Sequence, residues 1–201
     1  HTPHTPSQYL SIFLLSLSLV LPLEAASTIE RVLQSVAHVT GIGVDDHTGQ
    51  EYQYGCTAFA IAVRKFLTDE HCIGTNLKVD GYKAVALKVD ALRDLAIIMS
   101  DYSLPALKIR KKPLTYLEKV TAFGHGYSWS KSMVTEHTVI MTKYTPETWI
   151  FPGTWFLGGF IGGMSGGPIV DTKGEVVGIV QRGNTQVGYG VDTETILDFL
   201  K

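Results

Sequence analysis

The sequence predicts an all-β fold, a sandwich or a barrel, for most of the 201-residue chain. After Val44 the chain consists of short apolar runs with a period close to two, which is the periodicity of strands with one buried face. Gly, Asp, Asn and Pro separate these runs and indicate turns. Helical periodicity is confined to the two ends, so strands are expected to form the core.

The same pattern predicts the individual elements in chain order. Strands are expected over residues 56–63, 77–89, 94–99, 119–124, 132–141, 167–171, 175–181 and 186–192. Helices are expected over residues 29–39 and 193–200, the second capped by Asp192 or Thr193. Residues 100–119 hold two prolines and a basic cluster, and they are expected to be a linker between two groups of strands.

Composition limits the classes of partner. Apolar residues make up 45% of the chain, enough for a sizeable core, whereas charged residues make up 18% and the formal net charge is -2. Without a basic field, nucleic acid and anionic membrane surfaces are not expected partners. No Cys/His metal-ligand spacing and no phosphate-binding loop is present, so neither a metal nor a cofactor is expected.

Residues 1–27 differ from the rest of the chain. Residues 9–23 carry no charge and are followed by the small residues Ala25, Ala26 and Ser27. An apolar run of this length is shorter than the roughly 20 residues of a spanning helix and is typical of a signal peptide. We therefore expect a secreted or periplasmic protein, the alternative being an uncleaved membrane tether through residues 9–23. Cys56 and Cys72, an even pair behind an export signal, form either a disulfide or two buried thiols.

The stretch 162–170, GGMSGGPIV, surrounds one serine with glycines. A serine hydroxyl becomes a nucleophile when a base removes its proton and donors stabilise the oxyanion that forms on the substrate. A sharp turn at Gly163 would aim the amides of Gly163 and Ser165 into one hollow. The stretch also matches the elbow of α/β-hydrolases, but that fold needs a helix after the serine, and Pro168 begins a strand-like segment instead.

A histidine base and an orienting carboxylate complete such a site. Among seven histidines, His71 follows an apolar stretch in FLTDEHC and is adjacent to Cys72. Asp94 heads the apolar segment DLAIIM, where a carboxylate needs a partner or an exposed position. Asp69, Asp80 and Asp90 have more polar neighbours and are weaker candidates.

Together these three segments resemble the trypsin/chymotrypsin-like serine protease superfamily. FLTDEHC resembles its histidine block, DLAIIM its aspartate block and GGMSGGPIV its serine block, in the family's chain order. The resemblance implies two six-stranded antiparallel β-barrels with a C-terminal helix, the first over residues 28–105 and the second over residues 106–201. It further implies a disulfide between Cys56 and Cys72.

The resemblance also implies residue roles. Ser165 is the nucleophile, His71 the general base and then acid, Asp94 the orienting carboxylate, and the amides of Gly163 and Ser165 form the oxyanion hole. Substrate would lie along residues 176–183. The residues that correspond to the substrate-binding strand and the primary pocket are Gly159, Phe160, Gln181, Gly183 and Gly188.

Two departures refine this expectation. Digestive members carry Asp directly before the serine, where it pairs with a newly cut N-terminus, but this chain has Met164. Activation by N-terminal insertion is therefore not expected, and the chain looks closer to HtrA/Deg-type and viral members. The base of the primary pocket, at Gly159, has no acid, which favours small or apolar residues before the scissile bond over Arg or Lys.

The expected function is that of a serine endopeptidase that acts on proteins or peptides through an acyl-enzyme. Two alternatives share the fold. One is an inactive, protease-like module that binds peptides, and the other is a viral protease that processes a polyprotein.

Overall fold

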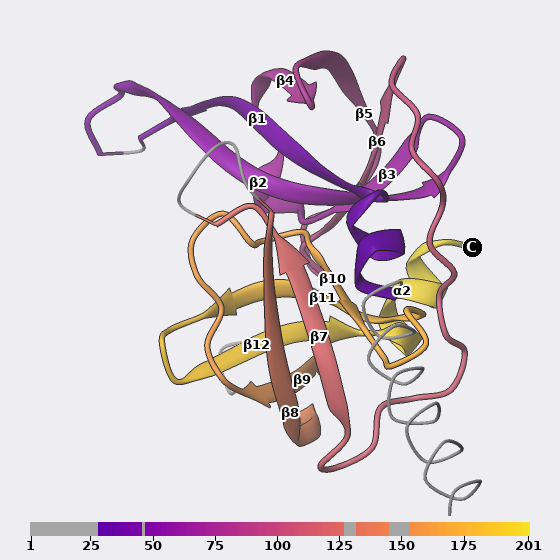
Figure 1. Ribbon diagram of the computed structural model, residues 1–201. Coiled ribbons are helices and arrows are strands. Elements are labelled where there is room, and N and C mark those ends of the chain that lie inside the picture. The colour runs from indigo at the N-terminus through magenta and orange to yellow at the C-terminus, as the bar shows by residue number, and fades with distance from the viewer. Residues whose placement is uncertain (1–27, 46, 127–131, 145–152) are drawn as a thin grey trace, which may run out of the picture.

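The computed structural model describes residues 28–45, 47–126, 132–144 and 153–201 (Figure 1). These residues form two closed, six-stranded antiparallel β-barrels followed by a short helix, which is the chymotrypsin-like fold expected from the sequence. The predicted export segment, residues 1–27, lies outside the described residues. Within the part of the chain that is described, no helix has the length and apolar character needed to cross a membrane.

The first barrel has the strand order β1-β2-β3-β6-β5-β4, closed by pairing of β4 with β1. Its interior is apolar, with Val39, Phe66 and Ile98 fully buried. Its strands are β1 (Val36–Val44), β2 (Glu51–Ala62), β3 (Lys65–Thr68), β4 (Thr75–Val79), β5 (Tyr82–Asp90) and β6 (Leu95–Ser100).

The second barrel has the order β10-β11-β12-β9-β8-β7, closed by pairing of β10 with β7. Its strands are β7 (Lys119–Gly124), β8 (Met133–Tyr144), β9 (Gly153–Leu157), β10 (Pro168–Val170), β11 (Val176–Gly183) and β12 (Val187–Asp192). The helix α2 (Thr193–Phe199) is capped by Asp192, one of the two capping residues expected from the sequence, whose carboxylate accepts a hydrogen bond from the Thr195 amide.

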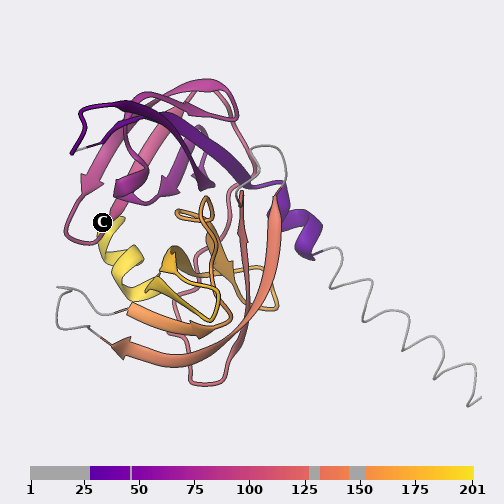
Figure 2. The ribbon, with the colours of Figure 1, turned by 90° about the vertical axis from the view of Figure 1, so that its left-hand side faces the viewer.

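The two barrels share one apolar interface. Figure 2 shows them one above the other with α2 at their boundary. Phe59 and Leu67 of the first barrel pack in the same cluster as Phe123 and Ile179 of the second and Phe199 of α2. Residues 101–118 cross between the barrels without a named strand and touch the second barrel through an isolated bridge between Ile109 and Val176. The predicted linker is thus confirmed as the crossing segment.

The structure corrects several of the predicted elements. Only residues 29–33 of the predicted helix 29–39 are helical, because the chain continues from Val36 as β1, with Val36, Ala37 and Val39 buried. The predicted strand 77–89 is two strands, separated by a turn at Asp80 and Gly81 where both residues have positive φ. The predicted set also lacked β1, β3 and β9.

Candidate active site

His71 lies in a single 3-10 turn, η1 (Glu70–Cys72), which follows the end of β3. Asp94 lies in the turn before β6 and takes a left-handed conformation with φ 54°. His71 Nδ1 is 2.9 Å from Asp94 Oδ2 and 3.0 Å from Oδ1, and the His71 amide donates to Oδ1 at 2.9 Å. The carboxylate therefore fixes both the ring and the backbone of His71.

The charge state of Asp94 suits this role. Burial raises the pKa of Asp94, but the hydrogen bonds and charge of His71, together with the guanidinium of Arg182, outweigh burial, so the pKa is lowered overall. Arg182 Nη2 lies 3.8 Å from Asp94 Oδ2. An ionised carboxylate on Nδ1 leaves Nε2 as the nitrogen that can accept a proton.

Ser165 lies in the tight turn between β9 and β10. Its Oγ donates a hydrogen bond to the Gln181 carbonyl on β11 at 3.0 Å. Gly166, the next residue, has φ 82°, and a β-carbon there would lie only 2.1 Å from the Thr57 carbonyl oxygen. Glycine is therefore required at 166 for the turn to lie against the first barrel.

Two amides of the serine turn remain available to a ligand. Neither the Gly163 nor the Ser165 amide donates to an acceptor among the described residues. The amides of the intervening and following residues are all occupied, Met164 by Ile161 (3.1 Å), Gly166 by Val180 (2.8 Å) and Gly167 by Met164 (2.9 Å). Free amides at alternate positions of a turn are what an oxyanion hole requires.

Thr57 on β2 connects the serine turn to the first barrel. Its amide donates to the Ser165 carbonyl at 2.8 Å, and its Oγ1 donates to the Gly163 carbonyl at 2.8 Å. Thr57 Oγ1 also accepts from the His125 amide at 2.8 Å. One buried residue thus positions both residues of the candidate oxyanion hole against the histidine-bearing barrel, Gly163 through its side chain and Ser165 through its backbone amide.

Cys56, next to Thr57, forms a disulfide with Cys72, next to His71. Both cysteines are buried. The bridge decides between the two possibilities that the sequence left open, and it links β2 to η1. It thereby restrains the turn that carries the candidate base.

Residues 56–179 match the model of the trypsin-like peptidase domain. The chain belongs to the trypsin-like peptidase family. No curated protein matches the chain. The active form of the Rv3671c protease from M. tuberculosis is similar in fold, with 18% identity, a TM-score of 0.73 and coverage of 86% of this chain and 82% of that chain.

The HtrA-type protease AlgW, solved with a decapeptide, is also similar in fold. The two sequences are 19% identical, the TM-score is 0.73, and the match covers 87% of this chain and 65% of that chain. This chain therefore spans about two thirds of the length of AlgW. These similarities show that this chain shares its fold with the two proteases.

Met164 stands where digestive members of the family have Asp, and its surroundings are apolar. Its side chain is fully buried and belongs to the apolar core of the second barrel, with Val120, Phe156 and Val180. A thioether is uncharged, so Met164 forms no ion pair with an ammonium group. The serine turn is thus supported by packing rather than by an ion pair.

The residues assigned to the primary pocket lie together, but Phe160 fills part of the space between them. A β-carbon on Gly188 would lie 2.5 Å from the Phe160 ring, and a β-carbon on Gly183 would lie 3.0 Å from the Phe160 amide nitrogen. Gly159 packs against the backbone of Asn184, whose carbonyl oxygen would be 1.6 Å from a β-carbon at 159. The Phe160 ring therefore takes up space beside Gly188.

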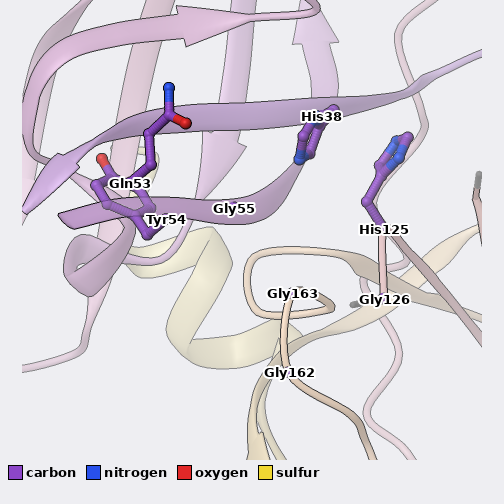
Figure 3. A pocket seen from close by; sticks show the side chains of 8 residues that line it. All are labelled: His38, Gln53, Tyr54, Gly55, His125, Gly126, Gly162 and Gly163. Atoms are coloured by element: carbon purple, nitrogen blue, oxygen red, sulfur yellow. The ribbon is translucent and has the colours of Figure 1, made fainter. Parts of the chain in front are cut away.

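A separate hollow of about 260 Å³ lies beside Gly163, on the side formed by β1, β2 and residues 125–126. Figure 3 shows His38 and His125 next to each other above the loop that carries Gly162 and Gly163. The two imidazole centroids are 5.0 Å apart. The hollow adjoins the candidate oxyanion hole but lies away from the β11 strand.

Three buried or half-buried imidazoles should make the protein less stable in mild acid. Burial lowers the pKa of His38 and His137, and burial together with the charge of His38 lowers the pKa of His125 to about 4. The unfolded imidazoles take up protons at about pH 6.5. Between about pH 6.5 and 4 the unfolded chain binds more protons, so the free energy of unfolding falls as pH is lowered.

Thermal unfolding at pH 7.0 and pH 5.0 checks this expectation. The melting temperature of His125→Asn should change less between the two pH values than that of the wild type. His47→Asn, which removes an exposed imidazole, should behave as the wild type does. An equal pH dependence in all three proteins would contradict the expectation.

Several residues of the site were missed by the sequence analysis. Asp69, assigned there to a polar neighbourhood, is fully buried, and His137, assigned only to a strand, is buried against Phe160 with ring centroids 4.8 Å apart. Thr57 and Arg182 carried no signal apart from their positions beside Cys56 and Gln181. Asp69, His71 and Asp94 offer N and O atoms all within 4.8 Å of one another, so titratable groups are concentrated around His71.

Proposed function

We propose that the protein is a serine endopeptidase in which Ser165, His71 and Asp94 form the catalytic triad. The observation that carries the proposal is the combination of a His71–Asp94 pair at 2.9 Å with two unoccupied amides, those of Gly163 and Ser165, around one serine. The pair supplies an oriented base, and the amides supply donors for the developing oxyanion.

The reaction follows from these positions. Ser165 Oγ turns from the Gln181 carbonyl toward His71 Nε2, loses its proton to that nitrogen and attacks the peptide carbonyl. The imidazolium, stabilised by Asp94, then donates the proton to the leaving nitrogen as the C–N bond breaks. Water hydrolyses the acyl-enzyme by the reverse sequence of proton transfers.

The exposed end of β11, at Arg182 and Gly183, is the proposed substrate-binding edge. Gln181, the buried residue before them, accepts the hydrogen bond from Ser165 Oγ and so places this edge next to the serine. An extended peptide adds to such an edge by main-chain hydrogen bonds. AlgW was solved with a bound decapeptide, which is consistent with a peptide substrate for this fold.

We further propose export from the cytoplasm. The Cys56–Cys72 disulfide favours an oxidising compartment, and the apolar residues 9–23 suit an export signal. Their removal or retention as a membrane tether is decided by N-terminal sequencing of secreted material.

The Phe160 ring beside Gly188 predicts a preference for small or apolar residues before the scissile bond, and peptide hydrolysis can test this preference. In a series that differs at the residue before the scissile bond, Ala, Val and Leu peptides should have higher kcat/KM than Arg and Lys peptides. The reason is that no acid lies at Gly159 to pair with a cation, and the Phe160 ring would limit the depth of the primary pocket. A preference for Arg would contradict the pocket assignment, and no cleavage of any peptide or of casein by folded protein would contradict the proposed function.

A further inference from the structure

Asp69 is a carboxyl group for which the proposed mechanism has no role. It lies between β3 and η1, two residues before His71, with none of its surface exposed to solvent. Neither carboxyl oxygen has a hydrogen-bond partner among the described residues, and the side chain does not cap η1. Burial of an unpartnered carboxyl group is costly, so its retention calls for an explanation.

The position of Asp69 points to the catalytic histidine. Its Oδ2 lies 3.9 Å from His71 Nε2, the nitrogen that would exchange protons with Ser165 and the leaving group. Asp94 binds the other ring nitrogen, Nδ1, at 2.9 Å. The imidazole therefore has a carboxyl group near each of its nitrogens, and only the one at Nδ1 is hydrogen-bonded.

The serine turn packs directly on this segment. A β-carbon at Gly166 would lie 2.3 Å from Thr68 Oγ1 and 3.1 Å from the Asp69 amide nitrogen. The serine turn therefore packs against the backbone at Asp69. The Asp69 carboxyl group is fully buried, so water screens its interaction with Nε2 only from the side of the partly exposed His71 ring.

The surroundings of Asp69 favour its protonated form. Burial, and then the negative charge of Asp94, raise the pKa of Asp69 well above its ordinary value. The Gly166 amide, whose own hydrogen bond goes to the Val180 carbonyl, and the Arg182 guanidinium favour the ionised form more weakly. His71, Asp94 and Arg182 are the titratable or charged groups that face Asp69 among the described residues.

We propose that Asp69 is a positioning residue that sets the alkaline limit of activity by holding or releasing a proton beside His71 Nε2. The proposal rests on the proposed function. While Asp69 is neutral, Nε2 is free to accept the Ser165 proton and to return it to the leaving nitrogen. When Asp69 ionises, its charge attracts the Nε2 proton and turns it away from Ser165 and the leaving nitrogen.

The pH profile of kcat/KM tests this role, measured on wild type and Asp69→Asn with one peptide substrate. The amide is neutral at every pH, so it imitates the protonated carboxyl group. The wild type should lose activity at alkaline pH, approaching about tenfold per pH unit beyond the midpoint of a single ionisation. Asp69→Asn should keep its neutral-pH activity through the same range.

Two further variants make the result specific. Glu70→Gln removes a neighbouring carboxylate from the same turn and should keep the wild-type alkaline loss. Asp69→Ser, which also cannot ionise in this range, should lack the loss, so the outcome does not depend on one replacement folding well. Infrared difference spectra at pH 7 should show a protonated carboxyl C=O stretch in the wild type that Asp69→Asn lacks.

The possible failures are distinguishable. If the wild type cleaves peptides and the profiles of wild type and Asp69→Asn superimpose, this proposal is overturned and the proposed function stands. An infrared spectrum that shows Asp69 ionised at pH 7 would also overturn this proposal and leave the proposed function standing. No cleavage by folded wild type at any pH would overturn both.

Discussion

Replacing Ser165 by Ala should lower kcat for peptide hydrolysis by about 10⁵- to 10⁶-fold, the loss expected when a triad nucleophile is removed. The side chain makes one hydrogen bond, to the Gln181 carbonyl, and Ser165 is only partly buried. Its removal should therefore leave folding almost unchanged. Hydrolysis rates and melting temperatures of wild type and Ser165→Ala, measured under the same conditions, check the two expectations together.

A double variant makes this test more stringent. His71 acts through Ser165 in the proposed mechanism, so the two losses should not add: Ser165→Ala/His71→Ala should be about as slow as Ser165→Ala alone. Independent roles would instead multiply the two losses. Retention of more than a small percentage of activity in Ser165→Ala would show that another group attacks the substrate.

Gly163→Ala should lower kcat by about 10²- to 10³-fold, the loss expected when one oxyanion donor is displaced. Gly163 has φ 91°, and a β-carbon would lie 2.2 Å from the His125 carbonyl oxygen. The turn must shift to relieve this overlap, which moves the Gly163 amide from its position. Because an oxyanion donor acts on the transition state, kcat and kcat/KM should fall together.

A second glycine separates this catalytic effect from backbone strain. Gly81 has a similar φ of 85°, in the turn between β4 and β5, and a β-carbon there would meet nothing within 4 Å. Gly81→Ala should reduce stability modestly and leave kcat unchanged. If Gly163→Ala folds and retains the wild-type kcat, the Gly163 amide is not part of the oxyanion hole.

Local sequence patterns were sufficient to predict most of the strands. Residues 119–122 alternate between polar and apolar, and residues 175–181 form a short run rich in apolar residues, so neighbouring residues were enough to predict β7 and β11. The helix predicted over 29–39 was wrong after residue 33 because the spacing of Val32, Val36 and Val39 suits one face of a helix, while pairing with β2 is a long-range effect. Similarly, β3 has only four residues, too few for a periodic signal.

The candidate site was predictable where its chemistry is local and not where it depends on packing. His71, Asp94 and Ser165 each stand in a short, distinctive segment, and the structure brings the first two within 2.9 Å. Asp69 lies within one of those segments, yet its burial depends on the Ser165–Gly166 turn, nearly 100 positions away in the chain. The position of Phe160 likewise depends on its packing against β9 and β12, two strands that pair with each other.

We claim that His71 activates Ser165, and labelling with a fluorophosphonate tests this. The probe forms a covalent bond only with an activated serine, and peptide mapping locates the adduct. We expect a single adduct on Ser165 in the wild type and almost none in a folded His71→Ala variant. No labelling of folded wild type, an adduct on another residue, or equal labelling of His71→Ala would contradict the claim.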